Sequence, residues 1–297
     1  MKFDIYEQVT ERIIKQLEKG IIPWKKPWKV SGVAIKGEQD LRKVAFNRIT
    51  KTAYSPLNQM LLEKAGEYAS FKQWQDLGGK IKKGAKAEIV VFWKMYEIIE
   101  PDKEKPEEMK RKQIPILKHL QVFHIDDVEN VKPLNIEEIK DIKEFDPIQE
   151  AESIIDNYKE REKIKILYDG NDAFYSPSSD YIQLPERFKF GTKTSEFYSV
   201  AFHEITHSTG AKFRLDRLET THFGSLSYSR EELVAEIGAC GMLNLLNIET
   251  NSSFTNSVAY IQSWIANLKK DPKLIVTASS KAEKAIKYIL GELQEAV

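Results

Sequence analysis

The spacing of hydrophobic residues predicts a chain that mixes helices and strands. Residues 1–20 place an apolar side chain every three or four positions, as an amphipathic helix does; these residues are Tyr6, Val9, Ile13 and Leu17. Two strands are predicted around a turn in residues 80–96, and another strand in 116–125. The almost wholly polar stretch 101–113 is typical of a surface loop or a hairpin tip.

The second half of the chain is richer in predicted helices. A helix near 148–158, a strand near 164–168 and two extended pieces in 173–184 come first. Four helices follow, predicted at 194–209, 229–246, 255–269 and 272–290. The acidic, Lys- and Glu-rich residues 128–147 are typical of a linker. The pattern therefore predicts an α+β protein with two domains, 1–127 and 148–297.

The net charge of zero conceals an uneven distribution. Residues 1–96 contain 19 Lys or Arg against 10 Asp or Glu, so the remainder of the chain is acidic. Four of the five tryptophans also lie in this basic segment. A basic, aromatic-rich half joined to an acidic half predicts two domains with different partners.

The composition also bears on the cellular compartment. The apolar runs are far too short to cross a bilayer, and residues 1–20 lack the apolar core of a signal peptide. Cys240 is the single cysteine, so it cannot form an internal disulfide. We therefore expect a cytoplasmic protein without a membrane partner.

The segment His203-Glu204-Ile205-Thr206-His207 carries the clearest chemical signal. Two histidines four residues apart share one helical face and can bind one Zn²⁺ ion, although Mn²⁺ or Co²⁺ suits the same ligands. Glu204 lies beside the first histidine, where a carboxylate can take a proton from water. This motif predicts a zinc metallopeptidase-type site.

A third metal ligand must come from elsewhere in the chain. Phe213 stands where one HExxH subclass has its third histidine, which excludes that subclass. Glu232 and Glu236 share one face of a later helix. We assign Glu232 to the metal and Glu236 to a hydrogen bond that orients His203 or His207. Two alternatives stay open: Glu236 is the ligand, or Glu232 only caps its helix together with Ser229.

Other residues near this motif could bind a substrate. Tyr228 and His222 lie between the two helices, and either could donate to an oxyanion or simply pack at the surface. Residues 179–184 read as an edge strand, which could hold an extended peptide by strand addition. We predict Glu204 and Tyr228 as the catalytic residues.

The basic half of the chain has features of a single-strand binder. Such proteins combine a positive groove with aromatic faces for the bases. We predict that DNA contacts the residues Trp24, Lys25, Lys26, Trp28, Lys29, Lys82, Lys83 and Lys86. The alternative is that the tryptophans belong to the core and the lysines to a solvated face.

Taken together, the motifs resemble the ArdC-type antirestriction proteins of plasmids, phages and other mobile elements. In the first half the resemblance rests on Tyr6-Glu7-Gln8-Val9-Thr10, Gly20-x-x-Pro23-Trp24-x-x-Pro27-Trp28, Phe71-Lys72-Gln73-Trp74 and Gly78-Gly79-x-Ile81-x-Lys83-Gly84. In the second half it rests on Ala173-x-Tyr175-Ser176-Pro177-x-x-Asp180, His203-Glu204-x-x-His207-Ser208-Thr209-Gly210, Arg214-Leu215-x-Arg217 and Tyr228-x-x-Glu231-Glu232-Leu233-Val234-Ala235-Glu236. The segment Ser55-Pro56-Leu57-Asn58 departs from the family pattern.

This resemblance implies a domain that binds single-stranded DNA, followed by a zincin-like metallopeptidase domain, and a role in protecting incoming DNA from restriction. The Glu232–Glu236 segment is also similar to the third-ligand helix of glutamate-type zincins, which favours Glu232 as the ligand. Whether the site is an active endopeptidase that cuts a DNA-associated host protein, a secondary site, or a silent relic in a DNA-binding module stays open.

Overall fold

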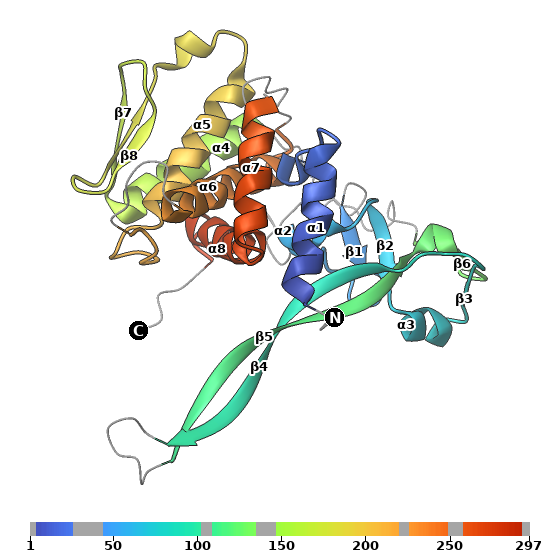
Figure 1. The fold of residues 1–297 in the computed structure, drawn as a ribbon. Coiled ribbons are helices and arrows are strands. Elements are labelled where there is room, and N and C mark those ends of the chain that lie inside the picture. The colour runs from blue at the N-terminus through green and yellow to red at the C-terminus, as the bar shows by residue number, and fades with distance from the viewer. Residues whose placement is uncertain are drawn as a thin grey trace.

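The computed structural model describes residues 4–25, 44–101, 109–134, 147–219, 226–248 and 258–292. Within these ranges the protein has the predicted α+β composition (Figure 1). The N-terminal half contains, in order, α1 (Ile5–Glu18), η1 (Pro23–Lys25), β1 (Ala45–Asn47), α2 (Pro56–Leu61), β2 (Gly66–Ala69), α3 (Phe71–Asp76), β3 (Lys80–Ile81), β4 (Glu88–Pro101), β5 (Met109–His124), η4 (Ile125–Asp127) and β6 (Val128–Glu129).

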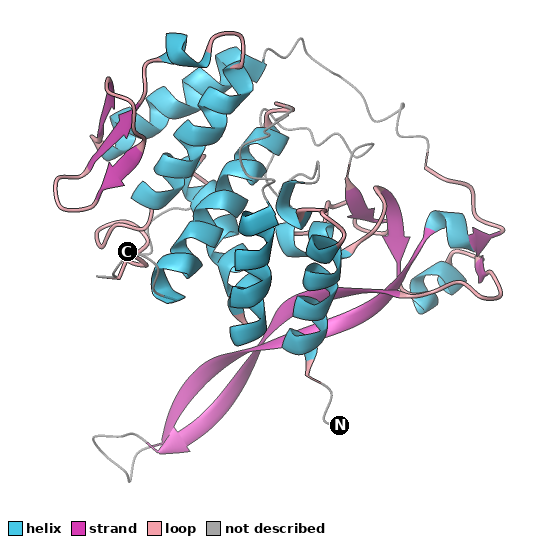
Figure 2. Ribbon diagram, turned by 45° about the horizontal axis from the view of Figure 1, so that its top comes forward, coloured by secondary structure: helices cyan, strands magenta, loops and turns pink. Residues whose placement is uncertain are grey.

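The C-terminal half is mostly helical. Its elements are α4 (Pro147–Glu162), β7 (Lys165–Tyr168), β8 (Phe174–Ser176), β9 (Tyr181–Leu184), η6 (Arg187–Phe190), α5 (Thr194–Ser208), α6 (Leu226–Leu245), α7 (Val258–Lys270) and α8 (Leu274–Ile289). Figure 2 shows these helices packed together, with the small sheet of β7, β8 and β9 on one side of them. No helix in the described ranges is both long enough and apolar enough to span a membrane.

The amphipathic helix predicted at the N-terminus is α1, and it packs on the C-terminal helices. Val9, Ile13 and Leu17 are buried as predicted, in the same hydrophobic cluster as residues of α7 and α8. The Thr10 hydroxyl donates to the backbone oxygen of Pro272 over 2.7 Å. The two halves therefore share a core, while the boundaries at 127 and 148 stay predictions.

The sheet of the N-terminal half has the strand order β1-β2-β5-β4. Its β4 and β5 strands form a long antiparallel hairpin that projects from the body (Figure 1). The two strands predicted around the Lys82-Lys83-Gly84 turn are β3 and the start of β4, and β3 pairs with β6. Since β6 (Val128–Glu129) lies at the start of the predicted linker, this part of the linker is ordered structure.

The segment Ser55–Asn58 leads into α2 and fastens it to β4. Asn58 is buried, and its side-chain amide donates to the backbone oxygen of Val91 while its side-chain oxygen accepts from the backbone N–H of Val91. A buried amide with donor and acceptor both satisfied is favourable. Asn58 therefore has a structural role at the base of the hairpin.

The small sheet of the C-terminal half has the order β7-β9-β8. Residues 179–184 were predicted to form an edge strand. That prediction is wrong, because they contain β9, the central strand of this sheet. Both edges of β9 are already paired, in parallel with β7 and antiparallel with β8. Within the described ranges β8 pairs with β9 on one edge, and its other edge lies beside α5, where the Tyr175 N–H reaches Glu204.

The packing of α5 against α6 leaves no space for a side chain at Gly238. A Cβ atom at Gly238 would lie 2.6 Å from Cγ2 and 2.7 Å from Oγ1 of Thr206, which is fully buried. We expect Gly238→Ala to force the two helices apart and to lower the free energy of unfolding by about 1–3 kcal/mol. Urea denaturation measures this loss, and unchanged stability would contradict it.

Candidate metal centre

The α5 helix positions the HExxH motif. Its buried face packs into the core through Phe197, Ala201 and Phe202. His203 and His207 are one turn apart, so both imidazoles leave the helix on the same side, with ring centroids 4.7 Å apart. The two histidines therefore present adjacent nitrogens to the neighbouring α6 helix.

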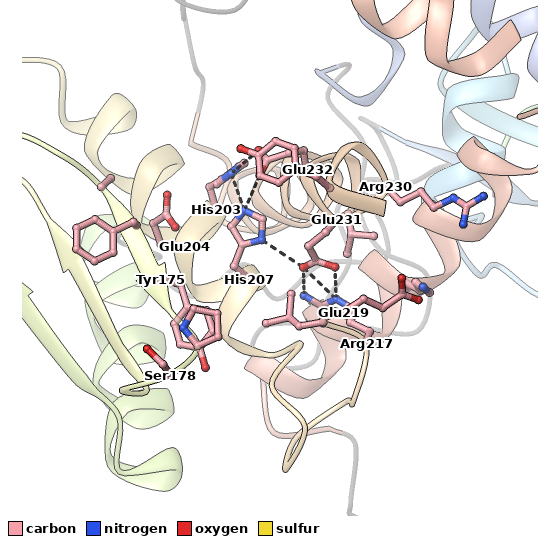
Figure 3. Close-up of a pocket in the computed structure, with 17 residues that line it drawn as sticks. Tyr175, Ser178, His203, Glu204, His207, Arg217, Glu219, Arg230, Glu231 and Glu232 are labelled. Carbon is pink, nitrogen blue, oxygen red and sulfur yellow. Dashed lines mark hydrogen bonds and ion pairs between the residues drawn. The ribbon is translucent and has the colours of Figure 1, made fainter. Parts of the chain in front are cut away.

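The α6 helix brings Glu232 to these nitrogens (Figure 3). His203 Nε2 lies 3.6 Å from Glu232 Oε2, and His207 Nε2 lies 3.5 Å from Glu232 Oε1. The two Nε2 atoms are 3.1 Å apart. A tetrahedral ion with ligand bonds of about 2.0–2.2 Å separates its ligand atoms by about 3.3–3.6 Å. Both distances to Glu232 fit that spacing and the two Nε2 atoms are slightly closer than it; the three side chains form the one such His, Cys, Asp or Glu group among the described residues.

The charges around the histidines favour a cation. Burial alone would lower the pKa of His203, but its hydrogen bond to Glu232 and the charges of Glu236 and Glu204 raise that pKa to about 9. Several carboxylates next to two imidazoles create a negative potential at the point where the Nε2 atoms meet. A divalent ion bound there would offset both the carboxylate charge and the repulsion between the nitrogen lone pairs.

Glu231 contacts His207 from the side opposite to Glu232. Its Oε1 lies 3.2 Å from His207 Nδ1, so an Nδ1–H donates to this carboxylate when Nε2 faces a metal. Arg217 in turn donates to both carboxylate oxygens of Glu231, over 3.0 Å from Nε to Oε2 and 2.9 Å from Nη2 to Oε1. This carboxylate–histidine arrangement fixes the orientation of the imidazole.

The structure corrects the orienting role predicted for Glu236 and excludes the capping alternative for Glu232. The carboxylate that hydrogen-bonds the Nδ1 atom of His207 is Glu231. Glu236 makes no hydrogen bond to either histidine in the part of the chain that the structure describes. Glu236 acts on His203 through its charge. The α6 helix begins at Leu226, so Ser229 lies inside the helix and the capping alternative for Glu232 is wrong.

Burial and hydrogen bonds act in opposite directions on the Glu231 carboxyl. Burial alone would raise the pKa of Glu231, but the hydrogen bonds from His207 and Arg217 hold it below its usual range. The carboxylate therefore stays charged and keeps His207 in one tautomer. Neither Glu231 nor Arg217 could be assigned a role from the sequence. The spacing of the carboxylates does not show which of the neighbours Glu231 and Glu232 contacts His207.

We expect Glu231→Gln to weaken Zn²⁺ binding by about 10- to 100-fold, since it removes the charge that orients His207 and pairs with Arg217. Competition with a chelating indicator measures this affinity. Glu219→Gln is a matched control, because Glu219 lines the same pocket but is exposed. Equal affinities of the two variants would contradict a positioning role for Glu231.

Glu204 lies between the histidines and β8. Its carboxylate is 8% exposed and accepts a hydrogen bond from the backbone N–H of Tyr175. Burial raises the pKa of the Glu204 carboxyl, while the neighbouring histidines act in the opposite direction. A buried carboxylate with a raised pKa beside a metal site is typical of a general base.

A cavity of about 760 Å³ opens at this point. On one side it is lined by β8 and the loop after it, including Phe174, Tyr175 and Ser178, and on the other side by α6. Tyr228 hydrogen-bonds Glu232; burial and the Glu232 charge raise the Tyr228 pKa to about 12. Its hydroxyl therefore keeps its proton near neutral pH and donates it to Glu232.

The structure describes the side chains of four of the predicted DNA-binding residues, namely Trp24, Lys82, Lys83 and Lys86. The prediction for Trp24 is wrong, because its ring is fully buried and packs edge-on against Trp264 with centroids 5.9 Å apart. The side chains of Lys25, Lys26, Trp28 and Lys29 lie outside the described residues, as does His222. Lys82, Lys83 and Lys86 are exposed on the turn after β3, and Lys82 Nζ donates to the backbone oxygen of Asp126 over 2.6 Å.

Two family models together cover most of the chain. The model of the N-terminal domain of the anti-restriction factor ArdC matches residues 3–123, and that of a zincin-like metallopeptidase matches residues 149–281. The uncharacterized protein y4eC of Sinorhizobium fredii (strain NBRC 101917 / NGR234) is 30% identical over 303 residues, 99% of this chain and 94% of that protein. DNA primase TraC of Escherichia coli is 30% identical over 311 residues, which are 100% of this chain but 20% of TraC.

Solved structures of ArdC from the R388 plasmid share this fold. The metal-free structure is 29% identical with a TM-score of 0.70, and the alignment covers 98% of both chains. The Mn(II)-bound structure has a TM-score of 0.71 at 29% identity, with coverage of 99% of this chain and 100% of that chain. The fold and the His-His-Glu group thus define a protein with a zincin-like metallopeptidase domain. The chain belongs to the ArdC family of antirestriction proteins.

Proposed function

We propose that this protein binds single-stranded DNA in its N-terminal half and hydrolyses peptide bonds at its metal centre, as an antirestriction protein of a mobile element. The observation that carries the proposal is the convergence of His203, His207 and Glu232 beside the buried Glu204. The site contains the side chains that metal-assisted hydrolysis requires, next to the outer edge of β8.

The ligand set suits Zn²⁺, and Mn²⁺ or Co²⁺ fits the same nitrogen and oxygen donors. The related R388 ArdC has been observed with Mn(II), which supports a divalent ion here. When bound, such an ion supplies Lewis acidity toward a carbonyl oxygen and toward water. His203, His207 and Glu232 would hold it, and Glu231 would keep His207 in the required orientation.

The remaining residues have separate roles in the proposed reaction. The outer edge of β8 can pair with an extended peptide and align it along the cavity. Glu204 would take a proton from the attacking water at its carboxylate and later return it to the leaving amine. Tyr228 would turn its hydroxyl from Glu232 to donate a hydrogen bond to the oxyanion.

DNA binding in the N-terminal half rests on its charge and on the family. Residues 1–96 carry the excess of Lys and Arg, and Lys82, Lys83 and Lys86 are exposed. A positive surface binds the phosphate backbone with an affinity that falls as salt rises. DNA bound there would bring DNA-associated host proteins to the metal centre, which makes such proteins the proposed substrates.

Fluorescence anisotropy with labelled oligonucleotides tests the DNA-binding half of the proposal. The full-length protein is expected to bind single strands more tightly than duplexes of the same length, and to lose affinity as salt is raised. A protein that binds neither form at low salt would contradict the proposed DNA binding and leave the metal centre as a separate question.

A further inference from the structure

The β4–β5 hairpin has two chemically different faces where it leaves the body of the protein. Directly paired residues share a face of an antiparallel ribbon. Four successive pairs form what we call the cationic face: Phe92–Lys118, Lys94–Ile116, Tyr96–Ile114 and Ile98–Lys112. Closer to the body on the same face, Val90 and Val122 are buried, whereas Leu120, the partner of Val90, exposes 43% of its surface.

Lysines and aromatic rings are interleaved on the cationic face. The Nζ atoms of Lys94 and Lys118 lie 5.3 and 5.4 Å from the centroid of the Tyr96 ring. One ring thus holds two ammonium groups close together by cation–π contacts. The next aromatic residue, Phe92, exposes 47% of its surface. The four pairs contain three lysines and no carboxylate.

The opposite face of the same ribbon has a different composition. Its pairs are Trp93–Leu117, Met95–Pro115, Glu97–Gln113 and Ile99–Arg111. Glu97 and Arg111 form an ion pair at 3.5 Å, so the charges on this face are balanced. We therefore expect a polyanion to bind the cationic face more tightly than the opposite face. Substitutions on the opposite face can serve as controls.

The dimensions of the cationic face suit a single nucleic-acid strand. Phe92 and Tyr96 are four residues apart on one strand, about 13 Å, with Lys94 between them. Proteins that bind single strands combine a basic track with aromatic surfaces on which bases stack. A duplex hides the faces of its bases within its own stack, so the exposed Phe92 ring favours a single strand.

We propose that the cationic face is the surface through which this protein binds single-stranded DNA. Phosphates would contact Lys94, Lys118 and Lys112, and a base would stack on Phe92. This inference rests on the proposed DNA binding and locates it on the hairpin (Figure 1), which the exposed lysines after β3 would only supplement. The hairpin extends away from the metal centre, so a strand bound there leaves the cavity open to a protein substrate.

The test is the salt dependence of binding to an oligo-dT longer than about 16 nucleotides. Each phosphate contact to a single strand contributes about 0.7 to the slope of log K against log salt. Lys94→Gln/Lys118→Gln should therefore reduce the slope by about 1.4 and weaken binding roughly tenfold at moderate salt. Lys159→Gln/Lys269→Gln makes the same change of charge at exposed sites on α4 and α7, and it should leave the slope unchanged.

Phe92→Leu tests the stacking contact and should weaken binding roughly tenfold. Trp93→Leu removes a similarly exposed ring from the opposite face and should change the affinity less than about twofold. If the hairpin variants and the control variants all bind oligo-dT as tightly as the wild type, the hairpin assignment is overturned. The proposed DNA binding then belongs to another surface. If the wild-type protein binds no single-stranded DNA, the proposed DNA binding and its assignment to the hairpin are both overturned. If it prefers duplex DNA, the assignment of the hairpin to single strands is overturned.

Discussion

Replacing Glu204 with glutamine is expected to lower peptide hydrolysis at least about a hundredfold and to leave the metal bound. Loss of a general base typically costs about 10²–10⁴ in rate. Glutamine keeps the size of the side chain and can still accept the hydrogen bond from the Tyr175 N–H, but it cannot take up a proton. Assays of a casein or peptide substrate, with metal content measured on the same samples, give both quantities.

Glu196→Gln is the matched control for this experiment. Glu196 lies in the first turn of the same helix and pairs with Lys193 at 3.3 Å, away from the metal centre. It should keep full activity. Antirestriction measured with the Glu204→Gln variant then separates two roles: protection that survives belongs to DNA binding, and protection that is lost belongs to peptide hydrolysis. A variant that hydrolyses peptides like the wild type contradicts the role of Glu204.

Replacing Glu232 with alanine is expected to weaken Zn²⁺ binding by more than about a hundredfold. Side chains that only orient a metal ligand already account for about 10–100-fold in affinity, so removal of a ligand should cost more. Glu232 is the carboxylate within 3.6 Å of both Nε2 atoms, and its loss leaves a two-histidine site. Chelator competition or calorimetry measures the affinity.

Glu236→Ala separates the two carboxylates of this helical face. It should retain Zn²⁺ binding, because Glu236 influences His203 through its charge and makes no hydrogen bond to either histidine within the described chain. If Glu232→Ala bound Zn²⁺ as tightly as the wild type and Glu236→Ala lost it, the two assignments would be exchanged.

The central part of the site could be predicted from the sequence because it depends on helix geometry. The i, i+4 spacing of His203 and His207 fixes their common face in any α-helix. Glu232 could be assigned to the metal from its place on the later helix, but Glu236 stayed open as the alternative because it shares the same helical face. Glu231 could not be ranked, because its contact with His207 depends on how α5 and α6 cross.

The less successful predictions concern tertiary contacts. Trp24 lies in a basic, aromatic segment, yet its ring packs on Trp264 from the other end of the chain. Composition does not reveal such a partner. The order β7-β9-β8 likewise depends on pairing between strands that alternation alone does not specify. The hairpin strands were predicted in part, but their length and projection became visible only in the fold.

Anomalous X-ray diffraction at the zinc absorption edge, from crystals grown with Zn²⁺, shows which side chains hold the ion. We predict one strong peak within about 2.0–2.2 Å of His203 Nε2, His207 Nε2 and a carboxylate oxygen of Glu232. A peak bound to Glu236 or to other residues, or the absence of a peak at the two histidines, would contradict it.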